Sequence, residues 1–177
     1  MASFATTLAG FGGQGILFTG KVMAYTGVVE DKFVSWLPSY GPEMRGGTCN
    51  CHVNVSDSPI GSPIVTKPNS VIVMNRPSFE KFVPKLVSGG TVIYDSSLID
   101  ITSDRDDIKQ FAIPATQMAT DMGMPKLANM IMFGKYVKEV GFLSLDAVRR
   151  GLEKSVPPTK KDLIESNWKA IETGYNY

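Results

Sequence analysis

The sequence predicts an α/β protein: a three-layer α/β/α fold around a largely parallel or mixed sheet, with a Rossmann-like start. One observation behind this prediction is the opening stretch from Phe4 to Gly27, which has the pattern of a strand, a glycine-rich loop and a helix. The other is the rest of the chain, where short apolar runs alternate with amphipathic stretches of helix length. With 177 residues, 43% of them hydrophobic, we expect a single domain covering residues 1–177.

The opening stretch divides into three parts. An apolar strand is predicted up to Ala9, and a helix is predicted to start near Gln14. The loop between them contains Gly10, Gly12, Gly13 and Gly15. Glycine lets the backbone take positive φ or approach another chain closely. On the helix, five side chains are predicted to cover the sheet: Ile16, Leu17, Val22, Met23 and Tyr25. Amide groups at its exposed N-terminus can face an anion or a partner's backbone.

The segment Gly10 to Gly15 has the Gly-x-Gly-x-x-Gly spacing of the dinucleotide-binding fingerprint. A bound ribose also needs an acidic residue at the end of the second strand, about 20 residues further on. Glu30 and Asp31 instead precede the candidate strand from Lys32 to Trp36, so the sequence argues against NAD. Two other interpretations are together favoured over a cofactor site: a tight turn, or a loop buried against a neighbouring subunit.

Charge and hydropathy narrow the possible partners. The chain has 18 basic and 17 acidic residues without a long basic run, which argues against nucleic acid as the main partner. No apolar run approaches the ~20 residues of a membrane-spanning helix. The start Met1-Ala2-Ser3 lacks the basic and apolar parts of a secretion signal. We therefore expect a cytoplasmic protein.

Both cysteines lie in a predicted half-buried strand from Thr48 to Ser56. Their spacing places Cys49 and Cys51 on one strand face with apolar neighbours, which favours reduced thiols used as small core hydrophobes. His52 points to the opposite face, so a metal site is the less favoured interpretation, and an iron–sulfur cluster needs about four cysteines. We interpret His52 as a polar strand residue rather than a catalytic base.

The segment from Leu37 to Gly47 is predicted to be a stiff loop, because prolines and glycines punctuate it. Tyr40, Glu43 and Arg45 place polar groups on that frame. Two interpretations stay open. Glu43 and Arg45 form an ion pair in an ordinary surface loop, or the segment is a docking surface in which Arg45 meets an anion.

The remaining elements complete the α/β pattern. Apolar strands are predicted at Val71 to Met74, Thr91 to Tyr94 and Phe111 to Pro114. Pro77 starts a helix between the first two, and Pro84 disturbs its last turn. Four more helices are predicted: around Thr116 to Met122, from Met130 to near Gly141, from Ser144, and after Thr159, which forms a capping-box pattern with Asp162.

Several motifs together resemble one protein family. They are Gly-Phe-Gly-Gly-Gln-Gly at Gly10 to Gly15, Pro-Ser-Tyr-Gly-Pro-Glu-Met-Arg-Gly-Gly at Pro38 to Gly47, and Ser-Asp-Ser-Pro-Ile at Ser56 to Ile60. Later matches are Met74-Asn75, Gly90 to Ser97, and Ala128-Asn129-Met130 leading into Gly134. Over nearly its whole length the chain resembles the gamma subunit of 2-oxoacid:ferredoxin (or other acceptor) oxidoreductases. Two glycine-rich motifs in this order and at this separation are far more specific than either alone.

The resemblance implies an enzyme complex that oxidatively decarboxylates a 2-oxoacid to its acyl-CoA. Such a complex uses thiamine diphosphate, Mg²⁺, iron–sulfur clusters and coenzyme A on or with other subunits, and passes electrons to ferredoxin or another acceptor. The implied partners are alpha and beta subunits and a ferredoxin-like subunit, and the implied fold is that of domain III of pyruvate:ferredoxin oxidoreductase. The region after Ala128 favours 2-oxoglutarate over pyruvate or branched-chain acids.

We predict no catalytic residue and no metal ligand in this chain. The predicted binding or subunit-interface residues are Gly10, Gly12, Gly13, Gln14, Gly15, Tyr40, Gly41, Glu43, Arg45, Gly46 and Gly47. Two alternatives stay open: a stand-alone nucleotide- or CoA-binding module, and a non-catalytic assembly protein.

Overall fold

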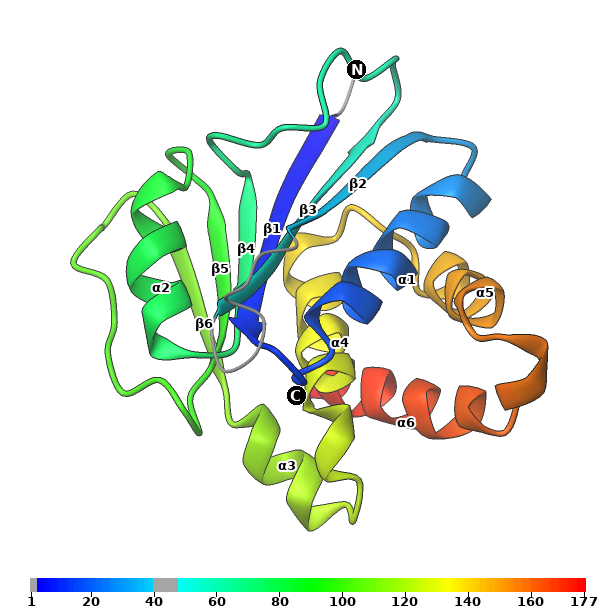
Figure 1. The fold of residues 1–177 in the computed structure, drawn as a ribbon. Coiled ribbons are helices and arrows are strands. Elements are labelled where there is room, and N and C mark those ends of the chain that lie inside the picture. The colour runs from blue at the N-terminus through cyan, green and yellow to red at the C-terminus, as the bar shows by residue number, and fades with distance from the viewer. Residues whose placement is uncertain (1–2, 40–47) are drawn as a thin grey trace.

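The computed structural model describes residues 3–39 and 48–177, which form a six-stranded sheet covered by helices on both faces (Figure 1). The strand order is β2-β3-β1-β4-β5-β6. The strands are β1 (Ser3–Phe11), β2 (Phe33–Ser39), β3 (Thr48–Ser56), β4 (Ser70–Val73), β5 (Thr91–Asp95) and β6 (Lys109–Ile113). The sheet is mixed, as predicted, because β4, β5 and β6 run parallel to β1 while β3 runs antiparallel to both β1 and β2.

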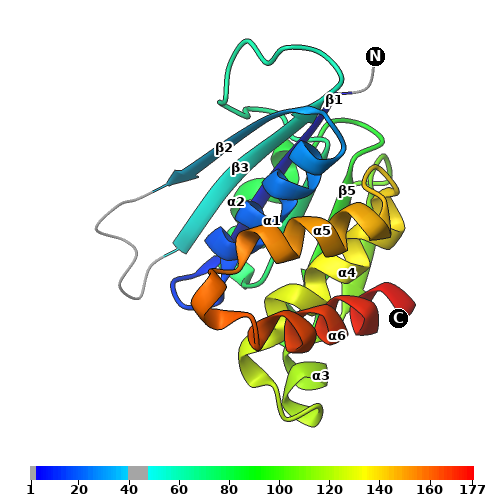
Figure 2. The same cartoon turned by 90° about the vertical axis from the view of Figure 1, so that its right-hand side faces the viewer.

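Helices form the outer layers of the fold. They are α1 (Ile16–Val29), α2 (Arg76–Phe82), α3 (Ala115–Asp121), α4 (Ala128–Val140), α5 (Leu145–Ser155) and α6 (Leu163–Asn176). Single turns of 3₁₀-helix cover Val83–Lys85, Pro125–Leu127 and Pro158–Lys160. Helices α1 and α4 pack on one sheet face, with α5 on α1 and α6 on α4, while α2 packs on the other face (Figures 1 and 2). The three-layer prediction is therefore confirmed.

Two apolar cores lie on the two faces of the sheet, because alternate strand residues point to opposite sides. Ile72 and Ile93 belong to the core beneath α1 and α4. Val71 and Val92 belong to the smaller core beneath α2. All four side chains are at most 1% exposed, so the central parallel strands are covered on both faces.

The helix layers come unusually close where glycines face a neighbour. A Cβ atom at Gly134 of α4 would overlap the carbonyl of Ile171 in α6, and one at Gly174 would overlap the carbonyl of Ile131 in α4. Gly151 of α5 lies in the same way against Thr26 of α1. These contacts fix the helix spacing and leave no room for a side chain.

Local predictions were wrong at a few boundaries. Helix α1 starts at Ile16 rather than near Gln14, and Tyr25 is 37% exposed instead of covering the sheet, because it lies on the solvent side of the helix. Strand β2 continues to Ser39, since its pairing with β3 includes Leu37 and Pro38, so the predicted loop does not begin at Leu37. Among the described residues no side chain caps α6, whose N-cap residue is Asp162, so the capping box with Thr159 is not formed.

Two other local predictions are confirmed. Pro84 lies in the 3₁₀ turn that ends the α2 region, and Gly141 takes φ 65° at the end of α4. In the described part of the chain, no helix is both long enough and apolar enough to cross a membrane.

Candidate functional site

The glycine-rich loop joins β1 to α1 at the carboxyl end of the central strand (Figure 1). Gly13 takes φ 93° and Gly15 takes φ 76°, a backbone region that favours glycine. Gly10 leaves room for the Gln14 side chain, because a Cβ atom at position 10 would lie 2.5 Å from the Gln14 Oε1 atom. Gly12 is exposed in the turn. Backbone conformation therefore explains Gly13 and Gly15, and the observed position of the Gln14 side chain favours glycine at position 10.

Gln14 ties this loop to the next strand of the sheet. Its Oε1 accepts a hydrogen bond from the Phe11 amide at 2.6 Å, and its Nε2 donates to the Met74 carbonyl at 3.1 Å. Met74 follows β4, and its own amide donates to the Ala9 carbonyl at 3.0 Å. Gln14 thus links the loop to the end of β1 and to the residue that follows β4.

Asn129, at the start of α4, holds the other side of the loop. Its Nδ2 donates to the Gly15 carbonyl at 3.2 Å and to Thr19 Oγ1 at 3.1 Å, and a Cβ atom at Gly15 would overlap this amide. The residue is only 5% exposed, and its Oδ1 has no hydrogen-bond partner in the described part of the chain. Asn129 was not among the predicted site residues. The available signal was its place in the motif Ala128-Asn129-Met130, where one amide lies inside an apolar helical stretch.

Two more polar residues end the strands beside the loop. Asn75, after β4, accepts a hydrogen bond from the Ser78 amide and so caps α2. Asp95, at the end of β5, is fully buried, and its carboxylate accepts hydrogen bonds from the Ser97 amide at 3.0 Å and from Thr116 Oγ1 at 2.5 Å. Because local donors already hold this carboxylate, Asp95 anchors the loops around the site rather than acting as a free base.

A cavity of about 220 Å³ opens between the loop and the segments that follow β4 and β5. Its lining residues are Gly13, Gln14, Met74, Leu98, Thr116, Pro125, Lys126 and Ala128. Ligands of open α/β sheets bind outside the carboxyl ends of the strands, which is where this cavity lies. Its volume is below the roughly 300–1,000 Å³ of ordinary ligand pockets. The cavity alone is therefore too small to enclose a molecule as large as coenzyme A.

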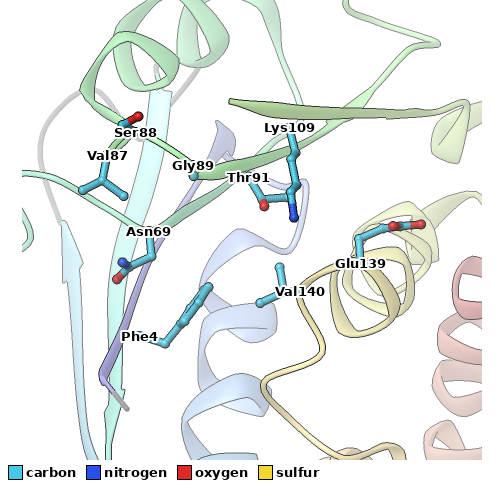
Figure 3. Close-up of a pocket in the computed structure, with 10 residues that line it drawn as sticks. Phe4, Asn69, Val87, Ser88, Gly89, Thr91, Lys109, Glu139 and Val140 are labelled. Atoms are coloured by element: carbon cyan, nitrogen blue, oxygen red, sulfur yellow. The ribbon is translucent and has the colours of Figure 1, made fainter. Parts of the chain in front are cut away.

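A second depression, of about 250 Å³, lies at the opposite end of the sheet (Figure 3). Lys109 points into it beside Thr91, whereas the Glu139 carboxylate points away and pairs with Lys135. The amides of Gly89, Gly90 and Lys109 already donate to backbone carbonyls. This depression offers a ligand few unused donors, so the loop end is the stronger candidate site.

The cysteine strand is structural. Cys49 and Cys51 are buried free thiols on the α1 face, and burial raises the pKa of Cys51 to about 12, so the thiolate is strongly disfavoured. His52 lies on the opposite face, where its Nδ1 is 2.9 Å from Thr7 Oγ1. Burial and then the charge of Lys85 lower the pKa of His52. The interpretation of these residues as core thiols and a polar strand residue is confirmed.

Part of the predicted site cannot be placed. Tyr40, Gly41, Glu43, Arg45, Gly46 and Gly47 lie outside the described residues. The structure places Gly12, Gly13, Gln14 and Gly15 in the turn between β1 and α1, and Gly13 and Gln14 line the cavity. Gly10 was predicted to belong to this loop but lies inside β1, because its backbone pairs with Cys49 of β3. Their role in binding or in subunit contact stays a prediction.

Comparison with known proteins identifies the family. The family model described as pyruvate ferredoxin/flavodoxin oxidoreductase matches residues 5–177. The chain belongs to this family. It is similar to the 2-oxoglutarate synthase subunit KorC of Methanocaldococcus jannaschii, with 32% identity over 95% of this chain and 90% of that one. It is also similar to the ketoisovalerate oxidoreductase subunit VorA of Methanothermobacter marburgensis, with 34% identity over 96% of this chain.

These members of the pyruvate ferredoxin/flavodoxin oxidoreductase family differ in length. The chain spans only 35% of the VorA relative but nearly all of the KorC relative. In structure it is similar to the gamma subunit of a keto/oxoacid ferredoxin oxidoreductase from Geobacter sulfurreducens, with a TM-score of 0.87, 26% identity and coverage of 99% of this chain and 96% of that one. The family predicted from the glycine motifs is confirmed.

Proposed function

We propose that this chain is the gamma subunit of a multisubunit 2-oxoacid:acceptor oxidoreductase. The observation that supports this most is the end-to-end similarity to a gamma subunit of known structure, which matches the chain in both length and fold. A relative of similar length is named as a subunit of 2-oxoglutarate synthase, and 2-oxoglutarate is accordingly the proposed substrate of the complex.

In this proposal the chain supports CoA-dependent oxidative decarboxylation without performing the chemical step. Thiamine diphosphate, Mg²⁺ and iron–sulfur clusters belong to the alpha, beta and ferredoxin-like subunits, and electrons leave for ferredoxin or another acceptor. Within the described residues, no group of three or more His, Cys, Asp and Glu side chains is arranged to hold a metal ion. Gln14, Asp95 and Asn129 each use side-chain groups to hold the loop or a strand end in place.

The glycine loop is proposed to contact the alpha subunit. Its conformation is fixed from within by Gln14 and Asn129, so it presents a stiff, low-profile surface to a neighbouring backbone. The cavity beside it holds at most a small part of a large ligand. These two facts favour subunit contact over a stand-alone CoA-binding module. The predicted contribution of Tyr40 to Gly47, with Arg45 meeting an anion, stays a prediction.

Reconstitution tests the proposed function. The chain is purified alone and together with the alpha and beta subunits of the proposed complex, and reduction of a viologen dye is measured with 2-oxoglutarate and CoA. We expect no turnover by the chain alone and CoA-dependent turnover by the assembled complex. Turnover by the isolated chain, or full activity of the other subunits without it, would contradict the proposal.

A further inference from the structure

Exposed apolar side chains gather along one edge of the molecule. Ten large hydrophobic residues of the described chain are exposed, and five of these fall between residues 25 and 37. They are Tyr25 and Val28 on α1, Trp36 on the α1 face of β2, and Phe33 and Leu37 on the other face of β2. A concentration of this kind on neighbouring elements is characteristic of an interaction surface, whereas single exposed apolar residues need no explanation.

Strand β2 forms one edge of the sheet and lacks the usual protection of such an edge. In the described part of the chain it pairs with β3 alone, so one side of its backbone is left without a strand partner (Figure 2). Edge strands are commonly protected by charged residues, yet Phe33–Ser39 contains none, and its only proline lies near the end. The opposite edge strand, β6, begins with Lys109.

A groove runs beside this edge between α1 and β2. It has a volume of about 210 Å³ and is lined by Lys21, Ala24, Tyr25, Val28 and Trp36. Gly20 allows the Trp36 indole to lie against the helix, since a Cβ atom at Gly20 would come within 3.0 Å of the indole nitrogen. The groove therefore has two aromatic walls and an aliphatic end, a shape that receives one apolar side chain. The ammonium group of Lys21, which also lines the groove, donates to the Ser155 carbonyl at 3.3 Å.

We propose that the β2 edge and this groove dock an extended segment of the neighbouring polypeptide in the complex. That polypeptide is the one corresponding to the additional sequence of the longer relatives. The segment adds a strand to β2 through its main chain and inserts an apolar side chain between Tyr25 and Trp36. This inference rests on the proposed function and specifies one of its interfaces.

The lengths of the relatives support this occupant over a second copy of the chain. In the VorA relative, the matching module makes up 35% of a longer chain, so most of that polypeptide lies outside it. In the KorC relative the module makes up nearly the whole chain. A module that is fused in one relative and separate in another must meet the remaining polypeptide through a surface that both arrangements keep. The β2 edge, which is apolar and unprotected, is the described surface best suited to this contact.

A pair of matched substitutions tests the docking surface. Val28→Lys places a charge in the groove, whereas Ile64→Lys places the same charge on the loop between β3 and β4. Both side chains are at least half exposed, at 50% and 65%, so neither substitution disturbs the core. With the co-purified alpha and beta subunits, we expect Val28→Lys to weaken association by about tenfold or more and Ile64→Lys to leave it within about twofold. Equal affinities of the two variants would overturn the proposal.

Backbone hydrogen exchange supplies an independent measurement on the unsubstituted protein. We expect the amides of residues 33–37 and 39 to exchange more slowly in the complex than in the isolated chain, while those of residues 109–113 on the opposite edge stay unchanged. Unchanged exchange in β2, or a β2 edge already protected by self-association of the isolated chain, would overturn the proposal. If the wild-type chain does not assemble at all, the proposed function fails. If it assembles and Val28→Lys assembles equally well, only the docking surface fails.

Discussion

Positions 13 and 15 both favour glycine because of their positive φ, but only position 15 also lacks room for a side chain. At Gly13 a Cβ atom would meet nothing within 4 Å among the described residues, so only its φ of 93° demands glycine there. At Gly15 a Cβ atom would also overlap the Asn129 amide. Gly13 is therefore the position at which a side chain can be added to the loop without breaking a contact inside the chain.

Gly13→Val is expected to destabilise the isolated chain by roughly 1–3 kcal/mol through its backbone conformation, and also to block assembly with the alpha subunit. Gly89→Val is the matched control, since Gly89 has φ 77°, similar open space and a place at the other end of the sheet. Urea unfolding should show similar losses for both variants. Co-purification should fail for Gly13→Val alone; equal yields would remove the loop from the interface.

Tyr136 provides a prediction about pH. Its hydroxyl is 2.9 Å from Thr6 Oγ1, which is 2.9 Å from Ser70 Oγ, and all three groups are buried. Burial raises the pKa of Tyr136, while the hydrogen bonds with Thr6 and Ser70 oppose that rise. The unfolded phenol has a pKa of about 10, so its contribution is fully present below pH ~10 and is lost as pH rises from there through the higher folded pKa.

The wild type should therefore lose more unfolding free energy between pH 8 and pH 11 than Tyr136→Phe does. Urea unfolding at the two pH values measures this difference, and all other titrating groups are shared by the two proteins. A loss of equal size in Tyr136→Phe would show that the buried phenol does not link folding to protonation.

At the scale of elements, the pairing of α4 with α6 depends on the absence of two side chains. Gly134 and Gly174 each face a backbone carbonyl of the other helix. A methyl group at either position forces the helices apart and disturbs the packing of the residues between them. This contact explains why a glycine, which is costly inside a helix, lies in the middle of α4.

Gly134→Ala is expected to lower the unfolding free energy by about 1–3 kcal/mol, although alanine has the better helix propensity. Gly61→Ala is the control, because a Cβ atom there meets nothing within 4 Å, and we expect it to change stability by less than about 1 kcal/mol. Denaturant unfolding of the isolated chain measures both. A neutral Gly134→Ala would mean that the two helices do not approach as closely as described.

Over the whole molecule, the two ends of the sheet have different roles. At the carboxyl ends of the parallel strands, Gln14 and Asn129 tie the glycine loop to its surroundings, Asp95 holds the start of α3, and a small cavity stays open between these segments. At the other end, main-chain groups are paired with one another. Strand β2 lies at the edge of the sheet, and within the described chain its outer side has no strand partner. The chain therefore has two surfaces that are proposed to contact partner subunits, the glycine loop and the edge of β2.

Local patterns in the sequence determined much of this fold. Alternation of polar and apolar residues gave the limits of β3 correctly, and glycine and proline marked the end of α4 and the irregular turn after α2. These features depend on backbone geometry and on burial of one face of a single element. The two glycine-rich motifs similarly identified the family from residues close together in the chain.

Only the tertiary structure decided which distant residues meet. It placed β3 between β1 and β2, brought the Asn129 amide to the Gly15 carbonyl across 114 positions, and left Tyr25 exposed at the edge. Hydrophobic periodicity shows that an element has a buried face, but strand order and helix spacing arise from packing the whole chain at once. For the same reason, the sequence marked the glycine loop as a site but did not show that Gln14 and Asn129 would hold it in place.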